Sequence, residues 1–420
     1  MMARFLVAVL IAGAFGSSVV SCNKDDVLVQ EMDNGEEDRD VIEGDFSASS
    51  IRYTFPGRPV LISFRGNDGA CGDGEAGISY RWAVNGSAAD WSGPAHMFTP
   101  DGPGEYVVTV TACGHDPLAV KVICVDASEG QRFRRATASS SAMSTRVYEW
   151  RPAPGQFIGE LHSGISGPDV TAEQARRWAE DRLEAGKYVS LGGFGGYIIV
   201  GFDHSVPCGD GGYDFSVTGN AFFNEQSGDG GSNEPGIVYV MQDVNGNGLP
   251  DDEWYELRGS DTGKAGTVSD YAVTYYRPEG PKKSVRWTDS LGESGVIDYI
   301  GAFHAQDYYY PLWIEEDSYT LCGTRLKAQT DQDPYTGMWN CHAFGWGYCD
   351  NMGSDRIADD DSNGSGHRNG FRISNAMHAD GSAVELRYVD FIKVQTGVNS
   401  KAGILGEVST EVFGFRDLSL

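Results

Sequence analysis

The feature that most constrains the fold is a long series of short runs rich in β-branched and aromatic residues, each bounded by glycine or polar residues. Such runs favour β-strands joined by tight turns. One segment has a convincing helical pattern: Thr171 and Gln174 form a capping box, and Gly186 follows at the place of a C-cap glycine. We therefore predict an all-β protein with one helix.

The strand-like runs fall into two groups. Residues 47–126 contain four runs at the spacing of a small sandwich, at 60–64, 79–84, 105–111 and 119–123. Residues 147–420 contain about nine runs, which predict one larger jelly-roll-like β-sandwich with elaborated loops. Residues 127–146 between them combine three arginines with a Thr/Ser-rich run, so we predict a solvated linker there.

The N-terminal residues have the pattern of an export signal. Arg4 precedes an apolar run, Phe5–Phe15, that is too short for a permanent membrane span but suits a signal peptide covering residues 1–21. The sequence VVSC then resembles the bacterial lipobox, which implies that Cys22 is lipidated and becomes the new N-terminus. An ordinary secretory signal with an unrelated cysteine is the alternative.

An acidic segment follows the lipobox. Acids far outnumber bases in residues 22–46 and aromatic residues are few, so this segment is predicted to be a solvated tether. Its start, Asn23-Lys24-Asp25-Asp26, resembles the signal that sends some Gram-negative lipoproteins to the outer face of the outer membrane. We expect a lipid-anchored protein that faces the cell exterior.

The charge balance restricts the possible partners. The chain has 60 acidic and 32 basic residues and a formal net charge of −28. This charge repels phosphate backbones, so we expect no nucleic-acid partner. Cations are the natural counterpart of such a surface.

A candidate cation loop lies at residues 243–256, DVNGNGLPDDEWYE. Asp243, Asn245 and Asn247 occupy positions 1, 3 and 5 of the Ca²⁺-loop spacing, with Gly248 at position 6, where the chain turns sharply. Position 12 is Trp254 instead of the usual bidentate acid, so the acids at 251, 252, 253 or 256 would have to complete the shell. The predicted Ca²⁺ ligands are Asp243, Asn245, Asn247, Asp251 and Glu253. A polar hairpin loop without an ion is the alternative, and residues 359–364 form a weaker second candidate.

Two loops are unusually aromatic. Residues 304–313 and 335–348 mix Tyr, Trp, Phe and His with polar side chains. Flat rings next to Asp, Asn and Gln are suited to sugars or large planar ligands, because the ring stacks on one face while the polar groups bond the edges. About half of the rings are expected in the core. Those predicted to be exposed and to bind a ligand are Tyr309, Trp313, Trp339 and Trp346.

The sequence gives no reason to propose an enzyme. Neither a GxSxG nor an HExxH motif occurs, and acid pairs carry little information in a chain with 60 acids. The glycine-rich stretch LGGFGGY at 191–197 precedes Ile198-Ile199-Val200 and not a helix, so it lacks the phosphate cradle of a dinucleotide loop. We predict instead that these glycines allow close packing or a bulge.

Seven cysteines follow Cys22, and no two of them have the CxxC spacing of a zinc or redox site. An exported chain can hold disulfides. Cys113 with Cys124, and Cys341 with Cys349, are near enough in sequence to pair.

The first strand group resembles a known module. The stretches YRWAVNG and HMFTPDGPGEYVVTVTA are similar to the PKD family of Ig-like domains, with Asn85-Gly86 in place of the family's acidic-glycine turn. The resemblance implies a spacer or an interaction domain at residues 47–126.

Residues 147–420 resemble a family of bacterial cell-surface lipoproteins that carry a PKD-like module before a β domain. The resemblance lies in PAPGQFIGE, YVSLGGFGGYIIVGFDHSV, EPGIVYVMQDVNGNGLPDDEWYELRGS and VDFIKVQTGVN. It implies an accessory surface protein of a TonB-dependent uptake locus. The expected function is non-catalytic capture of a nutrient ligand, a glycan or a corrinoid, for a TonB-dependent transporter. An adhesin or structural surface module is the alternative, and a polysaccharide hydrolase is a less favoured one.

Overall fold

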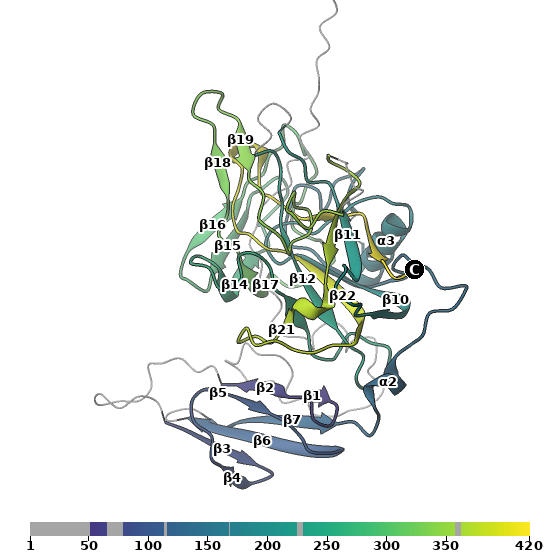
Figure 1. Ribbon diagram of the computed structural model, residues 1–420. Coiled ribbons are helices and arrows are strands. Elements are labelled where there is room, and N and C mark those ends of the chain that lie inside the picture. The colour runs from purple at the N-terminus through teal and green to yellow at the C-terminus, as the bar shows by residue number, and fades with distance from the viewer. Residues whose placement is uncertain (1–50, 65–78, 113–115, 168, 225–229, 358–362) are drawn as a thin grey trace, which may run out of the picture.

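The computed structural model describes residues 51–64, 79–112, 116–167, 169–224, 230–357 and 363–420. Two β-rich units follow one another along the chain (Figure 1). The α-helices in the described part are α2 (Glu129–Arg132) and α3 (Ala172–Glu184), and every other long element is a strand. The predicted all-β sandwich class is therefore confirmed. The signal segment, Cys22 and the acidic tether lie outside the described residues.

The N-terminal unit is a small sandwich of two sheets. Its buried side chains come from both sheets: Trp82, with 3% of its surface exposed, shares one apolar cluster with Val60 and Val108. Alternate residues of its longest strands are buried, as expected for strands with one face on the core. One sheet has the order β1 (Ile51–Thr54), β7 (Leu118–Cys124), β6 (Gly104–Ala112), β3 (Tyr80–Val84), β4 (Ser87–Ala89), and the other pairs β2 (Val60–Ser63) with β5 (Ala95–Phe98).

The C-terminal body consists of three larger sheets and two short ladders. The largest sheet has the order β21 (Ala376–Met377), β13 (Tyr255–Leu257), β12 (Gly236–Met241), β22 (Tyr388–Thr396), β10 (Tyr197–Pro207), β8 (Arg146–Arg151). The second sheet has the order β20 (His367–Phe371), β11 (Phe215–Gly219), β24 (Gly414–Asp417). The third has the order β16 (Ser294–Ile297), β15 (Val285–Asp289), β14 (Val268–Tyr276), β17 (Ser318–Arg325). The two short ladders pair β18 (Thr330–Gln332) with β19 (Trp339–Cys341), and β23 (Glu411–Val412) with β9 (Val189–Ser190). Two short 3₁₀ turns, η1 (Ile373–Asn375) and η2 (Gly403–Leu405), complete it.

The centre of the body is covered on both faces of its largest sheet. Every residue of β12 and β22 is buried, which explains why these strands have almost no hydrophobic alternation. One apolar cluster joins this sheet to β14, β17, β11 and α3. Polar groups on these strands consequently need partners inside the protein.

Helix α3 begins where the sequence predicts. The Thr171 hydroxyl accepts a hydrogen bond from the backbone of Gln174 at 3.2 Å, and the Gln174 side chain accepts one from the backbone of Thr171 at 2.9 Å. Ala175, Ala179 and Leu183 are its buried residues, at the spacing of one helix face. This face packs against β8 and β9.

The glycine-rich stretch 191–197 confirms the close-packing prediction. Gly192 has a φ of +64°, a backbone conformation that residues with a side chain rarely adopt. A Cβ added at Gly196 would overlap the carbonyl oxygen of Leu191, and one added at Gly192 would overlap that of Ala153. The glycines therefore allow backbone segments to touch at the entrance of β10.

Neither of the two disulfides that the sequence spacing allows is formed. Cys341 and Cys349 are both free buried thiols, and so is Cys124, which excludes its pairing with Cys113. Burial raises the pKa of the Cys341 thiol to about 12. These sulfur atoms act as small apolar groups in the core.

None of the described helices is long and apolar enough to cross a bilayer.

We expect Gly196→Ala to lower the free energy of unfolding by about 3 kcal/mol, because the added methyl group has no space beside the Leu191 carbonyl. The control is Gly212→Ala, where an added Cβ meets nothing within 4 Å. Urea denaturation of both variants checks the expectation. Equal stability of the two would show that the backbone at Gly196 yields easily.

Candidate functional site

The candidate cation loop connects two neighbouring strands of the largest sheet. β12 and β13 pair antiparallel, with Tyr239 opposite Glu256 and Val240 opposite Tyr255. Residues 242–254 form the connection between them. Strand pairing at both ends thus fixes where this loop begins and ends.

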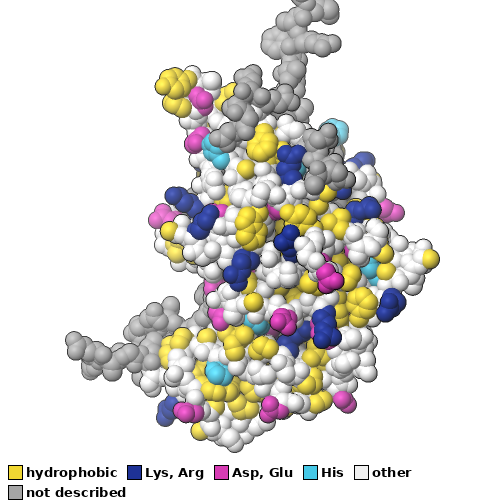
Figure 2. All heavy atoms as spheres, in the orientation of Figure 1, with side chains coloured by type: hydrophobic (Ala, Val, Ile, Leu, Met, Phe, Trp, Pro, Cys, Tyr) yellow, Lys and Arg dark blue, Asp and Glu magenta, His cyan; other side chains and the backbone are white. Residues whose placement is uncertain are grey.

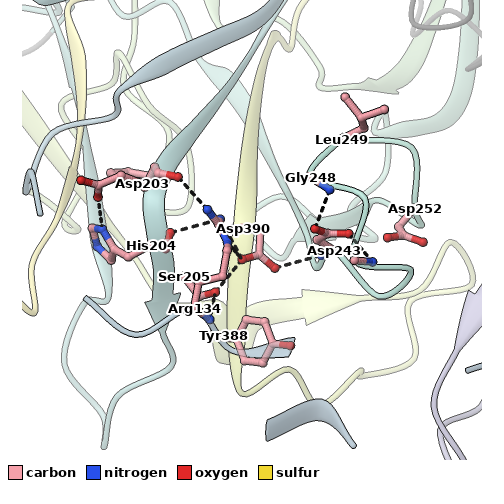
Figure 3. A network of polar contacts seen from close by, with 12 residues as sticks. Arg134, Asp203, His204, Ser205, Asp243, Gly248, Leu249, Asp252, Tyr388 and Asp390 are labelled. Atoms are coloured by element: carbon pink, nitrogen blue, oxygen red, sulfur yellow. Dashed lines mark hydrogen bonds and ion pairs between the residues drawn. The ribbon is translucent and has the colours of Figure 1, made fainter. Parts of the chain in front are cut away.

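Asp243 organises the first half of the loop (Figure 3). Its Oδ1 accepts hydrogen bonds from the backbone N–H groups of Gly246 at 2.7 Å and Asn247 at 3.1 Å, and its Oδ2 accepts one from Gly248 at 2.9 Å. Gly246 and Gly248 both have a φ of +77°. This left-handed backbone favours glycine and explains the repeated Asn-Gly of the sequence.

The second half of the loop brings the remaining oxygen-bearing groups together. The Nδ2 of Asn245 donates to Oδ1 of Asp251 at 3.0 Å, and the Nδ2 of Asn247 donates to Oδ2 of Asp251 at 2.7 Å. Four of the five predicted ligands, including Asp243, therefore belong to one hydrogen-bonded loop.

The prediction for Glu253 is corrected by the structure. Its carboxylate accepts a hydrogen bond from the Tyr255 hydroxyl at 3.3 Å and takes no part in the bonds that close the loop. Asp252 takes the inner position instead, since its Oδ2 accepts from the backbone of Val244 at 2.7 Å and Asn245 at 3.3 Å. Asp251 and Asp252 therefore both bond within the loop, whereas the Glu253 carboxylate is directed to the Tyr255 hydroxyl.

The start of the loop is held by Asp390, a buried residue of β22 for which no sequence pattern predicts a role. Its Oδ2 accepts from the backbone N–H of Asp243 at 2.9 Å, while its Oδ1 accepts from the Ser205 hydroxyl at 2.6 Å (Figure 3). Arg134 donates to the same Oδ1 from Nε at 3.2 Å and from Nη2 at 3.0 Å. Burial raises the pKa of Asp390, and these hydrogen bonds and the arginine charge act in the opposite direction.

The segment predicted as a solvated linker is consequently docked on the body. Arg134 also donates to the carbonyl oxygens of Phe202 at 3.1 Å and His204 at 3.3 Å. The backbone of Ser205 donates to the Arg134 carbonyl at 2.9 Å. Arg134 is a structural cation and not a free surface charge.

The loop also adjoins the contact between the two units. Arg58 of the N-terminal sandwich donates to Gln242 at 2.5 Å and to Glu129 of α2 at 2.8 Å. Gln242 in turn donates to the same Glu129 oxygen at 2.8 Å. The guanidinium of Arg132 lies so close to Gly246 that a Cβ there would overlap it. A change in the conformation of the loop would therefore alter the contacts between the N-terminal sandwich and the body.

The arrangement is chemically suited to a hard cation. Its donors are carboxylate and amide oxygens, which Ca²⁺ prefers. The side chains that could hold the ion are Asp243, Asn245, Asn247, Asp251 and Asp252. The side-chain amides of Asn245 and Asn247 direct their nitrogen atoms to Asp251. Rotation of each amide by 180° would direct its oxygen atom there instead, because an amide carries both an NH₂ group and an oxygen.

Two of the four predicted ligand-binding rings are in the core. Tyr309 has none of its surface exposed and Trp313 only 8%. The Tyr309 hydroxyl donates to the His304 carbonyl at 2.9 Å, and Trp313 packs on Trp150 with ring centroids 5.1 Å apart. The prediction that these two rings face a ligand is wrong, because a tyrosine or tryptophan can be buried once its polar atom has a partner.

The other two rings keep access to solvent. Trp339 is half-buried at the start of β19, and 37% of Trp346 is exposed. The weaker Asp-rich candidate at 359–364 lies, up to residue 362, outside the described residues.

No known family model and no curated protein matches this sequence. A function must therefore be inferred from the residues of this chain.

We expect Asp390→Ala to lower the free energy of unfolding by about 3 kcal/mol, because Arg134, Ser205 and the Asp243 amide lose their shared acceptor. Asp210→Ala, which removes an exposed acid, is the control and should change stability by less than about 0.5 kcal/mol. Thermal or urea unfolding measures both. A small effect of Asp390→Ala would mean that water replaces the carboxylate readily.

Proposed function

We propose that this chain is a non-catalytic, lipid-anchored outer-membrane protein that faces the cell exterior and captures a nutrient ligand, a glycan or a corrinoid, for a TonB-dependent transporter. The observation that supports capture is a group of exposed aromatic and apolar side chains around the β18–β19 hairpin. The anchor and its orientation are supported by the lipobox at Cys22 and the signal after it.

The hairpin projects from the body at the end away from the N-terminal sandwich (Figure 1). At its turn, 96% of Tyr335 and 53% of Met338 are exposed. Figure 2 shows hydrophobic side chains gathered at this outer end. The turn is well defined, since Oδ1 of Asp333 accepts from the backbone of Tyr335 and Thr336 at 2.8 Å each. Exposed apolar groups on an ordered turn are typical of a binding surface.

One apolar cluster supports Trp339 directly and contains residues close in sequence to Trp346. Phe344 and Tyr348, on either side of Trp346, are buried in that cluster, and Trp339 packs against it. Turn η2 lies directly over the Trp339 ring. A rigidly held ring loses little entropy when a flat ligand stacks on it, which favours a sugar or a corrin.

The N-terminal sandwich would serve as the spacer that its resemblance to PKD modules implies. A buried Trp82 and the Tyr106 hydroxyl, which donates to the Gly102 carbonyl at 2.8 Å, are similar to features of Ig-like domains. This supports the resemblance at the level of the scaffold.

We also propose that the 243–252 loop binds Ca²⁺ as a structural ion. Ca²⁺ would supply the positive charge that several close carboxylates require. The loop residues would hold its shape and its contact with α2, and no catalytic step is assigned to them.

For ligand capture, we expect wild-type protein to bind a member of a panel of glycans and cyanocobalamin, and Trp346→Ala to bind it about tenfold more weakly through loss of stacking. Phe303→Ala, which removes a ring that is 67% exposed elsewhere, should bind normally. Isothermal titration calorimetry measures the affinities. Failure of the wild type against the whole panel, with no TonB-dependent receptor recovered from membranes, would contradict the proposal and favour the adhesin alternative.

For the loop, we expect Ca²⁺ at about 100 times its Kd to stabilise the mature protein by about 2.7 kcal/mol. Brief chelation should reverse the stabilisation that comes from an ion in the exposed loop. Asp251→Ala should abolish this reversible stabilisation. Glu253→Gln should keep it, because Glu253 lies outside the hydrogen-bonded loop residues. Thermal unfolding across a Ca²⁺ titration measures the response. An identical response in both variants would exclude the loop as the binding site.

A further inference from the structure

Three carboxyl groups from distant segments meet inside the body. Glu234 precedes β12, Asp350 lies between β19 and β20, and Glu411 begins β23. A carboxylate oxygen from each lies within 4.8 Å of the others. Their exposed fractions are 2%, 0% and 0%, so all three are shielded from water.

The Asp350 carboxylate is held in place by backbone groups. Its Oδ1 accepts hydrogen bonds from the backbone of Asn220 at 2.7 Å and Ala221 at 2.8 Å, and its Oδ2 accepts one from Glu411 at 3.0 Å. Asp350 has a φ of +51°, a conformation that L-residues rarely adopt. A Cβ on Gly219 would lie 2.6 Å from Oδ1, so the carboxylate occupies space that a larger residue would fill.

Each glutamate has a serine partner, but Glu411 is only partly satisfied. Oε1 of Glu234 accepts from the Ser232 hydroxyl at 2.7 Å, and Oε1 of Glu411 accepts from the Ser409 hydroxyl at 2.5 Å. The Oε2 of Glu411 is buried and has no hydrogen-bond partner. A fully buried carboxylate oxygen without a donor requires either a cation or a proton held by a neighbouring acid such as Glu234.

The side-chain amide of Asn220 lies beside the three carboxyl groups. The Asn220 side-chain amide lies 3.0 Å and 3.2 Å from the two Asp350 oxygens. Asn220 is itself 5% exposed. With its nitrogen toward Asp350 it is a donor to the carboxylate, and with its oxygen in that place it is a further ligand for a cation.

In the part of the chain that the structure describes, no Lys, Arg or His is among the main groups that act on the charges of Glu234, Asp350 and Glu411. Burial, and the repulsion between neighbouring acids, raise the pKa of Glu234 and Asp350 well above the usual range. Like charges within 4.8 Å of one another repel strongly where water is excluded. Three charges could coexist here only around a cation.

We propose that Glu234, Asp350 and Glu411 bind a hard divalent cation, best matched by Ca²⁺, as a buried structural site. All the donors are oxygens, which suit Ca²⁺ and not the nitrogen and sulfur preferences of Zn²⁺. The site is separate from the 243–252 loop and does not depend on ligand capture.

This ion would act as a cross-link within the body. It joins the start of β12, the loop before β20 and the start of β23, which are far apart in sequence. Because the site forms only when these segments meet, the binding energy would contribute directly to folding. A fully enclosed ion would also exchange slowly, unlike an ion in the exposed loop.

The test uses the full mature chain, refolded from urea in either Ca²⁺ or a chelator and then freed of loose ions by gel filtration. We expect the protein refolded in Ca²⁺ to retain about one equivalent of calcium, measured by elemental analysis, and its Tm to exceed that of the chelator sample by about 5 °C or more. Glu411→Gln should lose the retained ion, and Asp251→Ala should keep it.

The opposite result is equally clear. If both refolded samples contain no metal and unfold at the same temperature, the carboxyls hold protons and the proposal is overturned. Retention of calcium by Glu411→Gln would likewise exclude this site. Should that variant fail to fold, the comparison of the two wild-type samples still decides, and Glu234→Gln provides the second variant.

Discussion

The need to match every buried carboxylate with donors or positive charge governs the body of this protein. Its largest sheet is covered on both faces, so acids on its central strands and beside them cannot be solvated. Asp390 satisfies this need within the chain, through Arg134, Ser205 and a backbone amide. The cluster around Asp350 leaves an oxygen of Glu411 without a donor, which is why we propose a cation there.

The Asp390 network connects parts of the molecule that the sequence separates. One of its oxygens orients the start of the candidate cation loop, and the other fixes the segment that leads from the N-terminal sandwich. Arg58 and Glu129 extend the same set of contacts to the sandwich. The relation between the two units thus depends on a buried acid, and a cation in the adjacent loop would reinforce it.

The hydroxyl groups of buried tyrosines also need hydrogen-bond partners inside the protein. Buried tyrosine hydroxyls donate hydrogen bonds to backbone carbonyls: Tyr275 donates to Phe194 at 3.1 Å, and Tyr319 donates to Pro152 at 2.8 Å. Their rings can then enter the core without loss of hydrogen bonding. Some rings stay at the surface, and those around the β18–β19 hairpin form the surface that we assign to ligand capture.

The sequence by itself determined the features that depend on neighbours along the chain. These are the strand content, the capping box of α3, the glycines at 191–197 and the convergence of Asp243, Asn245, Asn247 and Asp251, because side-chain alternation and backbone φ are local properties. Only the tertiary structure decided which rings are buried, which cysteines stay free, that Asp252 replaces Glu253 in the loop, and that three acids meet. Among 60 acids no spacing singles out Glu234, Asp350 and Glu411, since burial and through-space distance arise only when separate segments pack together.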